Sequence, residues 1–382
     1  MVQSIHDPNY QQCSISVMDN IADPNISFDE KGVCNYYYEY LEIAKNALFS
    51  GEEGNHKLQN LINQIKFDGK NKKYDCITGV SGGVDSSYLV YMAKKWGLRP
   101  LLVHFDNGWN SEIAVKNINN LVSHSGFDLY TLVVNWEEFR DLQKSYIKAS
   151  VVDIEVPTDH AISGTLQKLA SKFNVKYILS GNNIVSEAIL PPSWIFDKGD
   201  HINLLNIHKK FGNISLKSYP IYGFREVYYF GMLKGITTVK PLNYLDFNHE
   251  IARQEIIAAF GWQEYGGKHY ESYFTKFYQA YILPEKFKID KRKAHLSNLI
   301  FSNQLTKEQA LITLNTPLYA NEHERNREME YVLKKLGFSL NEFEIVMNQP
   351  RVEHLNYGKK EALTKKIPFL KIFRPIKKFL IQ

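Results

Sequence analysis

Residues 74–97 read YDCITGVSGGVDSSYLVYMAKKWG, and this stretch decides the fold. The apolar run CITGV leads into the polar hexapeptide SGGVDS, and an apolar helical pattern follows until Gly97 and Pro100 stop it. Paired glycines let the backbone approach a ligand and present consecutive N–H groups, and the helix adds the positive end of its dipole. The stretch therefore predicts a strand, a phosphate-binding loop and a helix. A tight turn without a ligand is the plainer alternative.

The residue types in SGGVDS indicate how phosphate would be held. Ser81 and Ser86 can donate hydroxyl hydrogen bonds, while Gly82 and Gly83 supply backbone N–H groups. Asp85 would repel phosphate, so we expect it to help bind Mg²⁺, although capping of the helix would also explain it. The lysine of a Walker A loop and the dinucleotide pattern GxGxxG are both missing here.

Strands and amphipathic helices alternate beyond this loop, through the strand-like runs LLVHF, LYTLVV and KYILSG. This alternation predicts an α/β fold with a doubly wound, mostly parallel sheet, and such sheets bind ligands at the carboxyl ends of their strands. Polar clusters follow the second and fourth strands at those ends. Each cluster alone could be an ordinary loop, but together with SGGVDS they indicate one site. Their members are His104, Phe105, Asp106, Gly181 and Asn182.

SGGVDS resembles the PP-loop of the ATP pyrophosphatase superfamily, which includes NAD, GMP and asparagine synthetases and tRNA-modifying enzymes. The resemblance implies ATP and Mg²⁺ as cofactors and cleavage of ATP between the α- and β-phosphates, with the loop holding the pyrophosphate that leaves. It also implies that residues 104–106 lie beside the adenosine, and that Gly181, followed by Asn182, permits a close approach to the nucleotide.

Length and composition predict a cytoplasmic protein of two or three structural units. The chain has 382 residues, is 44% hydrophobic, carries a net charge of +5, and begins without the pattern of a signal peptide. No apolar run is long enough to span a bilayer, and three cysteines do not suggest a disulfide framework. We expect an irregular N-terminal segment at 1–70, a PP-loop ATP-binding domain at 71–215 and a mostly helical substrate or partner domain at 216–382. The basic, apolar stretch 359–380 is interpreted as a solvated terminal helix rather than a contact for nucleic acid or a membrane.

Longer motifs narrow the resemblance. VPTDHAI (156–162), KGITTVKPLNYLDFN (234–248) and GGKHYES (266–272) make the chain similar, from about residue 13 to 315, to the N-acetyl sugar amidotransferase family of WbpG- and PseA-like proteins. The resemblance implies conversion of an acetamido group on a nucleotide-linked sugar to an acetamidino group, in the biosynthesis of lipopolysaccharide O-antigen or a related bacterial surface glycan. ATP would place AMP on the amide oxygen, and ammonia would then displace it. Because the chain shows no glutaminase unit of its own, separate glutaminase and cyclase-like subunits are implied as the ammonia source.

The same resemblance suggests roles for charged residues in the C-terminal half. Lys268, Lys291 and Arg292 are candidates for cations beside the phosphates. His269 and Glu271 could orient the substrate or move protons. A surface helix of mixed charge would also explain these residues, and it explains Lys291 and Arg292 equally well.

The VPTDHAI motif supplies a further candidate group. Thr158, Asp159 and His160 are expected to face the sugar or the nucleotide, with Asp159 as a catalytic candidate. Helix capping is the other explanation for Asp159, since an apolar helical pattern begins there.

The N-terminal cysteines depart from the family's pattern. Many members carry CxxC and later CNxC, four thiolates suited to a structural zinc. Here Ser16 and Tyr37 replace the second cysteine of each pair and leave only Cys13 and Cys34, so we expect a degenerate zinc-ribbon-like segment without zinc. Cys76 lies inside the first predicted strand and is expected in the core.

Two other functions remain open. The first is a tRNA-modifying PP-loop enzyme, although the chain shows no strong basic and aromatic stripe for RNA. The second is a catalytically silent subunit that binds nucleotide. The lost cysteines fit a silent subunit, whereas the intact SGGVDS favours an enzyme.

Overall fold

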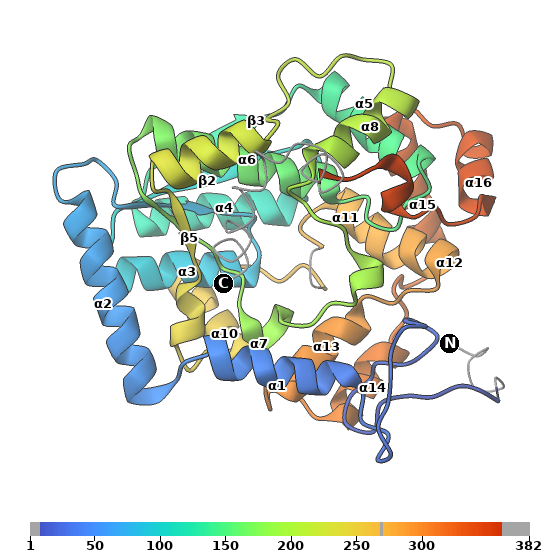
Figure 1. Cartoon of the computed structure of the whole chain (residues 1–382), viewed down its shortest axis with the longest axis horizontal. Helices are drawn as coiled ribbons and strands as arrows, with labels where there is room; N and C mark the ends of the chain where they lie inside the picture. The colour runs from blue at the N-terminus through green and yellow to red at the C-terminus, as the bar shows by residue number, and fades with distance from the viewer. Residues whose placement is uncertain (1–7, 268–269, 361–382) are drawn as a thin grey trace.

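The computed structural model of the chain describes residues 8–267 and 270–360, and it contains a five-stranded sheet (Figure 1). The strand order is β3-β2-β1-β4-β5, and every neighbouring pair is parallel. This arrangement confirms the predicted α/β class and the parallel sheet. The strands are β1 (Cys76–Gly79), β2 (Pro100–Asp106), β3 (Leu129–Val133), β4 (Tyr177–Leu179) and β5 (Thr237–Val239).

Helices cover both faces of the sheet, because alternate residues of its buried strands point to opposite sides. Ile77 and Val103 share an apolar cluster with Leu169 of α6 (Val156–Lys172) on one face. Leu102 lies on the other face, where its cluster includes Val90 of α3 (Val84–Lys95), Ile118 of α4 (Glu112–Ser125) and Ile256 of α10 (His249–Phe260). The doubly wound arrangement predicted from the alternating pattern is therefore confirmed.

The last strand, β5, lies beyond the predicted domain boundary at residue 215. It pairs with β4, and backbone hydrogen bonds continue the pairing from Thr237 N to Lys176 O (2.8 Å) and from Ser180 N to Val239 O (2.9 Å). The sheet thus takes a strand from the stretch that was assigned to a separate helical domain. The sequence does not reveal this strand, because three residues are too few to show the alternation typical of a strand.

The remaining described chain is mostly helical, and much of it packs around one large core. That core joins Met18 and Cys34 of the N-terminal segment to Phe274, Ala294 and Val332 of the C-terminal half, so the two ends of the chain fold together. The helices before β5 are α1 (Asn35–Ala47), α2 (Gly51–Gly69), α5 (Trp136–Lys148), α7 (Ile184–Glu187), α8 (His201–Phe211) and α9 (Phe224–Val227). Those after α10 are α11 (Tyr273–Phe277), α12 (Leu283–Phe287), α13 (Arg292–Phe301), α14 (Lys307–Asn315), α15 (Glu322–Leu336) and α16 (Leu340–Asn348).

The cysteine segment is compact and buried. Cys13 Sγ accepts hydrogen bonds from the backbone N–H groups of Ser16 (3.4 Å) and Cys34 (3.3 Å), and Ser16 Oγ lies 3.9 Å from Cys34 Sγ. Lys307 of α14 fastens the segment by donating to Cys13 O (2.6 Å). Cys76 is fully buried in β1, in agreement with the prediction of a core residue. Across residues 8–267 and 270–360, no three His, Cys, Asp or Glu side chains are grouped to hold a metal ion.

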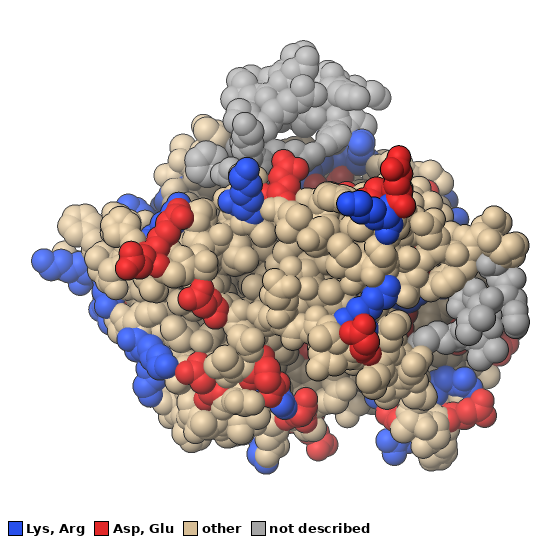
Figure 2. Space-filling view, turned by 90° about the horizontal axis from the view of Figure 1, so that it is seen from below, with Lys and Arg blue, Asp and Glu red and all other residues tan. Residues whose placement is uncertain are grey.

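The surface carries mixed charge on the face seen in Figure 2, where acidic and basic side chains are interspersed among other residues. Within the described ranges, no helix combines the length and the apolar character of a membrane span. Most of the basic, apolar stretch 359–380 lies outside the described residues.

Candidate active site

The SGGVDS loop forms a tight turn between β1 and α3, as predicted. Gly82 has a φ of +83°, and a Cβ at this position would lie 2.9 Å from the carbonyl oxygen of Ala114. The Gly82 carbonyl accepts hydrogen bonds from Trp262 Nε1 (2.8 Å) and Asn117 Nδ2 (3.4 Å), which hold the loop from its outer side. Only glycine meets both the positive φ and the close contact without strain.

The two serines of the loop shape it from within. Gly83 N donates to Ser81 Oγ (3.2 Å), Ser86 Oγ donates to Gly83 O (3.2 Å), and Ser81 N donates to Ser86 Oγ (3.4 Å). Gly83 is the N-cap of α3, and no side chain caps this end of the helix. These hydrogen bonds hold the loop at the N-terminus of α3, where the helix dipole favours an anion. Asp85 lies in the first turn of α3, two residues beyond the N-cap Gly83.

Glu271 lies beside this loop, as its predicted role requires. Its backbone carbonyl accepts from Ser111 N (2.8 Å), which fixes the segment next to the end of β2. A Cβ built on Gly83 would lie 3.3 Å from Tyr265 Oη and 3.5 Å from Glu271 Oε1. Burial, Glu271 and Asp85 together raise the pKa of Tyr265, so both carboxylates act on this hydroxyl. Lys268 and His269, which were predicted to act with Glu271, lie outside the described residues.

The end of β2 corrects two of the residues predicted to bind nucleotide. The Phe105 ring is buried against Phe139, with ring centroids 6.1 Å apart, so it belongs to the core. His104 is buried with both ring nitrogens engaged, Nδ1 at 3.1 Å from Val80 O and Nε2 at 3.0 Å from Asn110 Nδ2. Asp106 Oδ1 accepts from Gly108 N (2.9 Å) and from Asn110 Nδ2 (3.1 Å), and so shapes the turn that follows β2.

The end of β4 gives Gly181 a different role from the predicted one. A Cβ at Gly181 would lie 3.0 Å from the backbone carbonyl of Asp85, so this glycine lets the strand end pack against the first turn of α3. The requirement is backbone packing between β4 and α3 rather than an approach to the nucleotide. Asn182 is exposed at the carboxyl edge of the sheet, and its N–H donates to Ser180 Oγ (3.2 Å).

A cluster of charged side chains lies near the start of α6. Lys198 Nζ is 2.7 Å from both carboxylate oxygens of Asp153 and 3.1 Å from Asp159 Oδ2. Glu155 and Lys291 interact electrostatically with this group, from the N-cap positions of α6 and α13. We call these five residues the charged cluster. Burial opposes the charge on Lys198, but the two aspartates outweigh it and raise its pKa.

The direction of α6 puts the charged cluster at the same edge of the sheet as the SGGVDS loop, the edge where the strands end. The chain runs from α6 directly into β4, so α6 is antiparallel to the strands and its N-terminus lies at their carboxyl edge. The segment after Glu271 connects the two groups, because Thr275 Oγ1 of α11 donates to Glu155 Oε2 (3.1 Å). Asp159 and Lys291, both candidates from the sequence, are thus brought close enough to interact electrostatically. Thr158, which precedes Asp159 in α6, is half-buried.

Arg292 and His160 do not face this site. Arg292 binds Asp290 (Nη2 to Oδ2, 2.7 Å) and the carbonyl of Thr316 (2.7 Å), so its charge serves the end of α14 rather than a phosphate. His160 lies with Nδ1 2.8 Å from Lys198 O, while its Nε2 accepts from Tyr222 N (2.9 Å). Burial lowers the pKa of His160 to about 4, so the ring is a neutral tie between two loops.

Three residues near the site escaped the sequence analysis: Tyr265, Glu155 and Lys198. Lys198 stands in a loop without periodicity, and Tyr265 is one of many aromatic residues in its half of the chain. Glu155 did leave a signal, because it is an acid within the apolar run VVDIEVP, where a charge is costly unless it is used.

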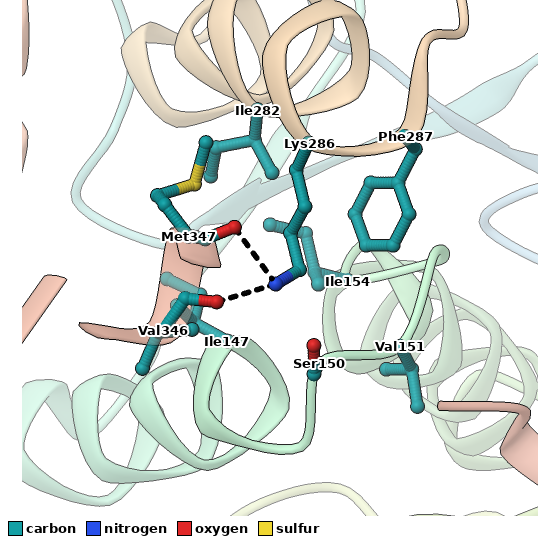
Figure 3. A pocket seen from close by; sticks show the side chains of 9 residues that line it. All are labelled: Ile147, Ser150, Val151, Ile154, Ile282, Lys286, Phe287, Val346 and Met347. Carbon is teal, nitrogen blue, oxygen red and sulfur yellow. Dashed lines mark hydrogen bonds between the residues drawn. The ribbon is translucent and has the colours of Figure 1, made fainter. Parts of the chain in front are cut away.

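A small apolar pocket elsewhere contains none of the predicted site residues (Figure 3). Lys286 of α12 reaches into it and donates to the carbonyls of Val346, Met347 (3.3 Å) and Gln349 (2.7 Å). Burial lowers the pKa of Lys286 to about 8. The contact fastens α12 to the C-terminal end of α16, and we assign it a structural role.

The chain resembles known proteins in separate parts. Residues 271–371 match the family model described as LPS biosynthesis protein WbpG-like, C-terminal domain. The chain is 27% identical over 177 residues to an uncharacterized protein of Methanocaldococcus jannaschii, and 37% identical over 76 residues to a tRNA(Ile)-lysidine synthase of Chlamydia pneumoniae. These matches cover 45% and 19% of the chain, and 59% and 23% of the two relatives, so the chain spans less than two thirds of either.

Three solved structures show a looser likeness. An NMN synthetase from Francisella tularensis is 14% identical, with a TM-score of 0.32, over 76% of this chain and 98% of its own. A structure described as a predicted subunit of a tRNA methyltransferase from Methanocaldococcus jannaschii is 15% identical (TM-score 0.29; 47% of this chain, 74% of that chain). An NH3-dependent NAD synthetase from Campylobacter jejuni is 13% identical (TM-score 0.27; 34% and 58%). The fold class rests on the sheet itself, and the WbpG-like match begins at Glu271, the residue that lies beside the loop.

Proposed function

We propose that the chain is an ATP-dependent, AMP-forming amidotransferase that converts the acetamido group of a nucleotide-linked sugar to an acetamidino group. One observation carries the proposal: Glu271, the first residue of the WbpG-like match, lies against Gly83 of a phosphate-binding loop at the carboxyl edge of a parallel sheet. A WbpG-like C-terminal region and an anion cradle thereby contribute to a single site.

The chemistry needs an activated amide, because resonance makes an acetamido carbon a poor electrophile. ATP supplies an AMP group to the amide oxygen and thereby creates a leaving group. Ser81, the Gly82 N–H group and the N-terminus of α3, which begins after Gly83, would hold the departing pyrophosphate. Asp159 and Lys291, at the same edge, would bind the sugar or stabilise developing charge.

The carboxylates at the loop fit Mg²⁺. Magnesium is usually held by one or two carboxylates together with phosphate oxygens and water. Asp85 and Glu271 both act on the Tyr265 hydroxyl, so two carboxylates lie close to the place where pyrophosphate would sit. Bound there, the ion would neutralise phosphate charge, and Asp85 is the residue that we propose to hold it.

The biological setting is part of the same proposal. Ammonia would come from glutaminase and cyclase-like partner subunits, the reaction would take place in the cytoplasm, and the product would enter lipopolysaccharide O-antigen or a related surface glycan. The description of the matching family as LPS biosynthesis proteins supports this setting.

The test is a screen of UDP- and CMP-linked acetamido sugars with ATP, Mg²⁺ and ammonium chloride. We expect release of pyrophosphate and AMP, and a product in which NH replaces the amide oxygen, detected by mass spectrometry. Glutamine in place of ammonium should give no product unless the partner subunits are added. Turnover with glutamine alone would contradict the requirement for partner subunits. If no acetamido sugar supported pyrophosphate release, the proposed function would be wrong.

A tRNA-modifying activity is the second candidate, favoured by the 76-residue likeness to a tRNA(Ile)-lysidine synthase. Pyrophosphate release that depends on added tRNA, and not on a sugar, would establish it instead. Release with neither class of substrate would favour a silent nucleotide-binding subunit.

A further inference from the structure

Glu155 is a buried carboxylate with one oxygen unused. It occupies the N-cap position of α6 but makes no side-chain capping hydrogen bond. Oε2 accepts from Thr275 Oγ1 (3.1 Å), whereas Oε1 is buried and makes no hydrogen bond within the described residues. Buried polar atoms are nearly always paired, and an exception at the edge of a site calls for an explanation.

The surroundings of Glu155 favour its neutral form near neutral pH. Burial is the main cause and the Asp159 carboxylate the next, and together they raise the pKa of Glu155 to about 7. Lys198 and Lys291 oppose this shift, and Asp153 adds to it. A carboxyl group poised near the working pH can both accept and return a proton, which is the property of a general base.

Several other titratable groups of the region already have hydrogen-bond or ion-pair partners. Asp153 binds Lys198 through both oxygens and also accepts from Phe196 N (2.9 Å). Asp159 is half exposed and pairs with the same lysine. His160 has both nitrogens engaged. Tyr278, which lies close enough to feel Glu155, donates to Val152 O (2.7 Å).

The position of Glu155 suits a proton transfer beside the activated amide. It stands at the carboxyl edge of the sheet, and its partner Thr275 is four residues beyond Glu271, which borders the loop. The loop and Glu155 are therefore linked by the short segment from Glu271 to Thr275.

We propose that Glu155 accepts the proton that the ammonia nucleophile loses during amidine formation, an inference that rests on the proposed function. The ammonia lone pair forms a C–N bond to the adenylylated, protonated imidate carbon, and the C=N electron pair moves to the sugar nitrogen. The new –NH₃⁺ group transfers one proton to Glu155 Oε1. The C–O bond to AMP then breaks with its electrons on the phosphate oxygen, leaving an amidinium product, and Glu155 returns its proton to solvent.

The experiment separates the two half-reactions in the full-length protein. Exchange of labelled pyrophosphate into ATP, with the best acetamido sugar of the screen and no ammonium, reports adenylylation alone. Amidine formation with ammonium chloride reports the second half. In Glu155→Gln we expect exchange to stay within about threefold of wild type, and amidine formation to fall by about a hundredfold or more. The inflection near pH 7 in its pH profile should disappear.

Two further variants distinguish proton transfer from a structural role. Thr275→Val removes a hydrogen bond to the charged carboxylate, so it should move the inflection to higher pH. The matched control is Glu138→Gln, another buried glutamate, whose Oε2 accepts from the backbone N–H groups of Lys217 (3.0 Å) and Tyr219 (3.0 Å). Its change should lower thermal stability and leave the inflection in place.

The outcomes divide cleanly. A folded Glu155→Gln protein that loses exchange together with amidine formation, or keeps both with the inflection intact, would overturn the role of Glu155 alone. Wild-type protein without sugar-dependent exchange for any sugar tested would instead overturn the proposed function, and the role of Glu155 with it.

Discussion

The SGGVDS loop and the charged cluster lie at the same edge of the sheet but are built in opposite ways. The loop uses six consecutive residues, and its internal hydrogen bonds join atoms no more than five residues apart. The charged cluster draws Asp153, Lys198 and Lys291 from three distant parts of the chain and depends on burial for its properties. A loop built from consecutive residues can be recognised in a sequence. A cluster of side chains from distant segments forms only when the chain folds.

The largest effect is expected from a substitution that removes Lys198 from the charged cluster. Lys198→Met leaves the Asp153 carboxylate buried without its cation, which should lower the free energy of unfolding by about 3–5 kcal/mol at neutral pH. Burial alone would raise the pKa of Asp153, but Lys198 outweighs it and holds the pKa below 3.8. The contribution of the pair is therefore present at neutral pH and is lost as the pH falls below 3.8, so the deficit of the variant should shrink in acid.

Urea denaturation over a pH series measures this deficit. Lys360→Met, which removes the neighbouring pair between Lys360 and the exposed Asp197 (2.6 Å), is the control and should cost less than about 1 kcal/mol. Equal costs for the two lysines would mean that the cluster is no more than a surface pair.

The next largest effect tests the loop. Gly82→Ala forces a Cβ to within 2.9 Å of Ala114 O at a φ of +83°, so the loop must change shape. Pyrophosphate release should fall by about a hundredfold to a thousandfold. Gly126→Ala has a similar φ of +75° but no atom within 4 Å, and should reduce stability only. Retained activity in Gly82→Ala would show that the backbone geometry of the loop is not what holds pyrophosphate.

A third prediction concerns the pH dependence of stability that Glu155 should cause. The pKa of Glu155 rises on folding from 4.5 to about 7, so the native protein loses stability relative to Glu155→Gln as the pH rises through that window. Below 4.5 both states are protonated and the difference should be small. Above 7 the variant should be the more stable by up to about 3 kcal/mol. Thermal unfolding of both proteins from pH 4 to 8 measures the difference, and a difference independent of pH would contradict the buried, raised carboxyl.

The smallest effect concerns the corrected residue at the end of β2. Phe105→Leu should cost about 1 kcal/mol of stability, because it is a change between apolar residues within a packed core. The KM for ATP should not change. Phe139→Leu, on the other side of the same ring contact, should behave alike. A raised KM for ATP in Phe105→Leu but not in Phe139→Leu would indicate that the Phe105 ring contacts the nucleotide.

Most of the fold was predictable because its elements are long and periodic. The β1–loop–α3 unit and the helices of both sheet faces show their apolar spacing in the sequence. β5 did not, because a three-residue strand gains its stability from pairing with β4 and has little pattern of its own. For the same reason the sequence did not show that the sheet takes a strand from beyond residue 215.

The candidate site was predictable where residue type alone limits the choice. Gly82 has the positive φ that demands glycine, and Glu271 of the GGKHYES motif lies beside the loop, while their roles in binding and catalysis stay predictions. The surroundings of Phe105 and Arg292 could not be predicted, because an aromatic ring after a strand can turn into the core and an arginine can bind a helix end as readily as a phosphate.

By itself the sequence determined the parallel α/β fold and the tight loop between its first strand and the following helix, because backbone conformation and apolar periodicity are properties of neighbouring residues. Only the tertiary structure decided which charges meet. Lys198 forms ion pairs with Asp153 and Asp159, and Arg292 donates to the carbonyl of Thr316 after α14. The Oε1 atom of Glu155 is buried and makes no hydrogen bond within the described residues. Burial and distance set the energy of a charge, and both are fixed by segments far apart in the chain.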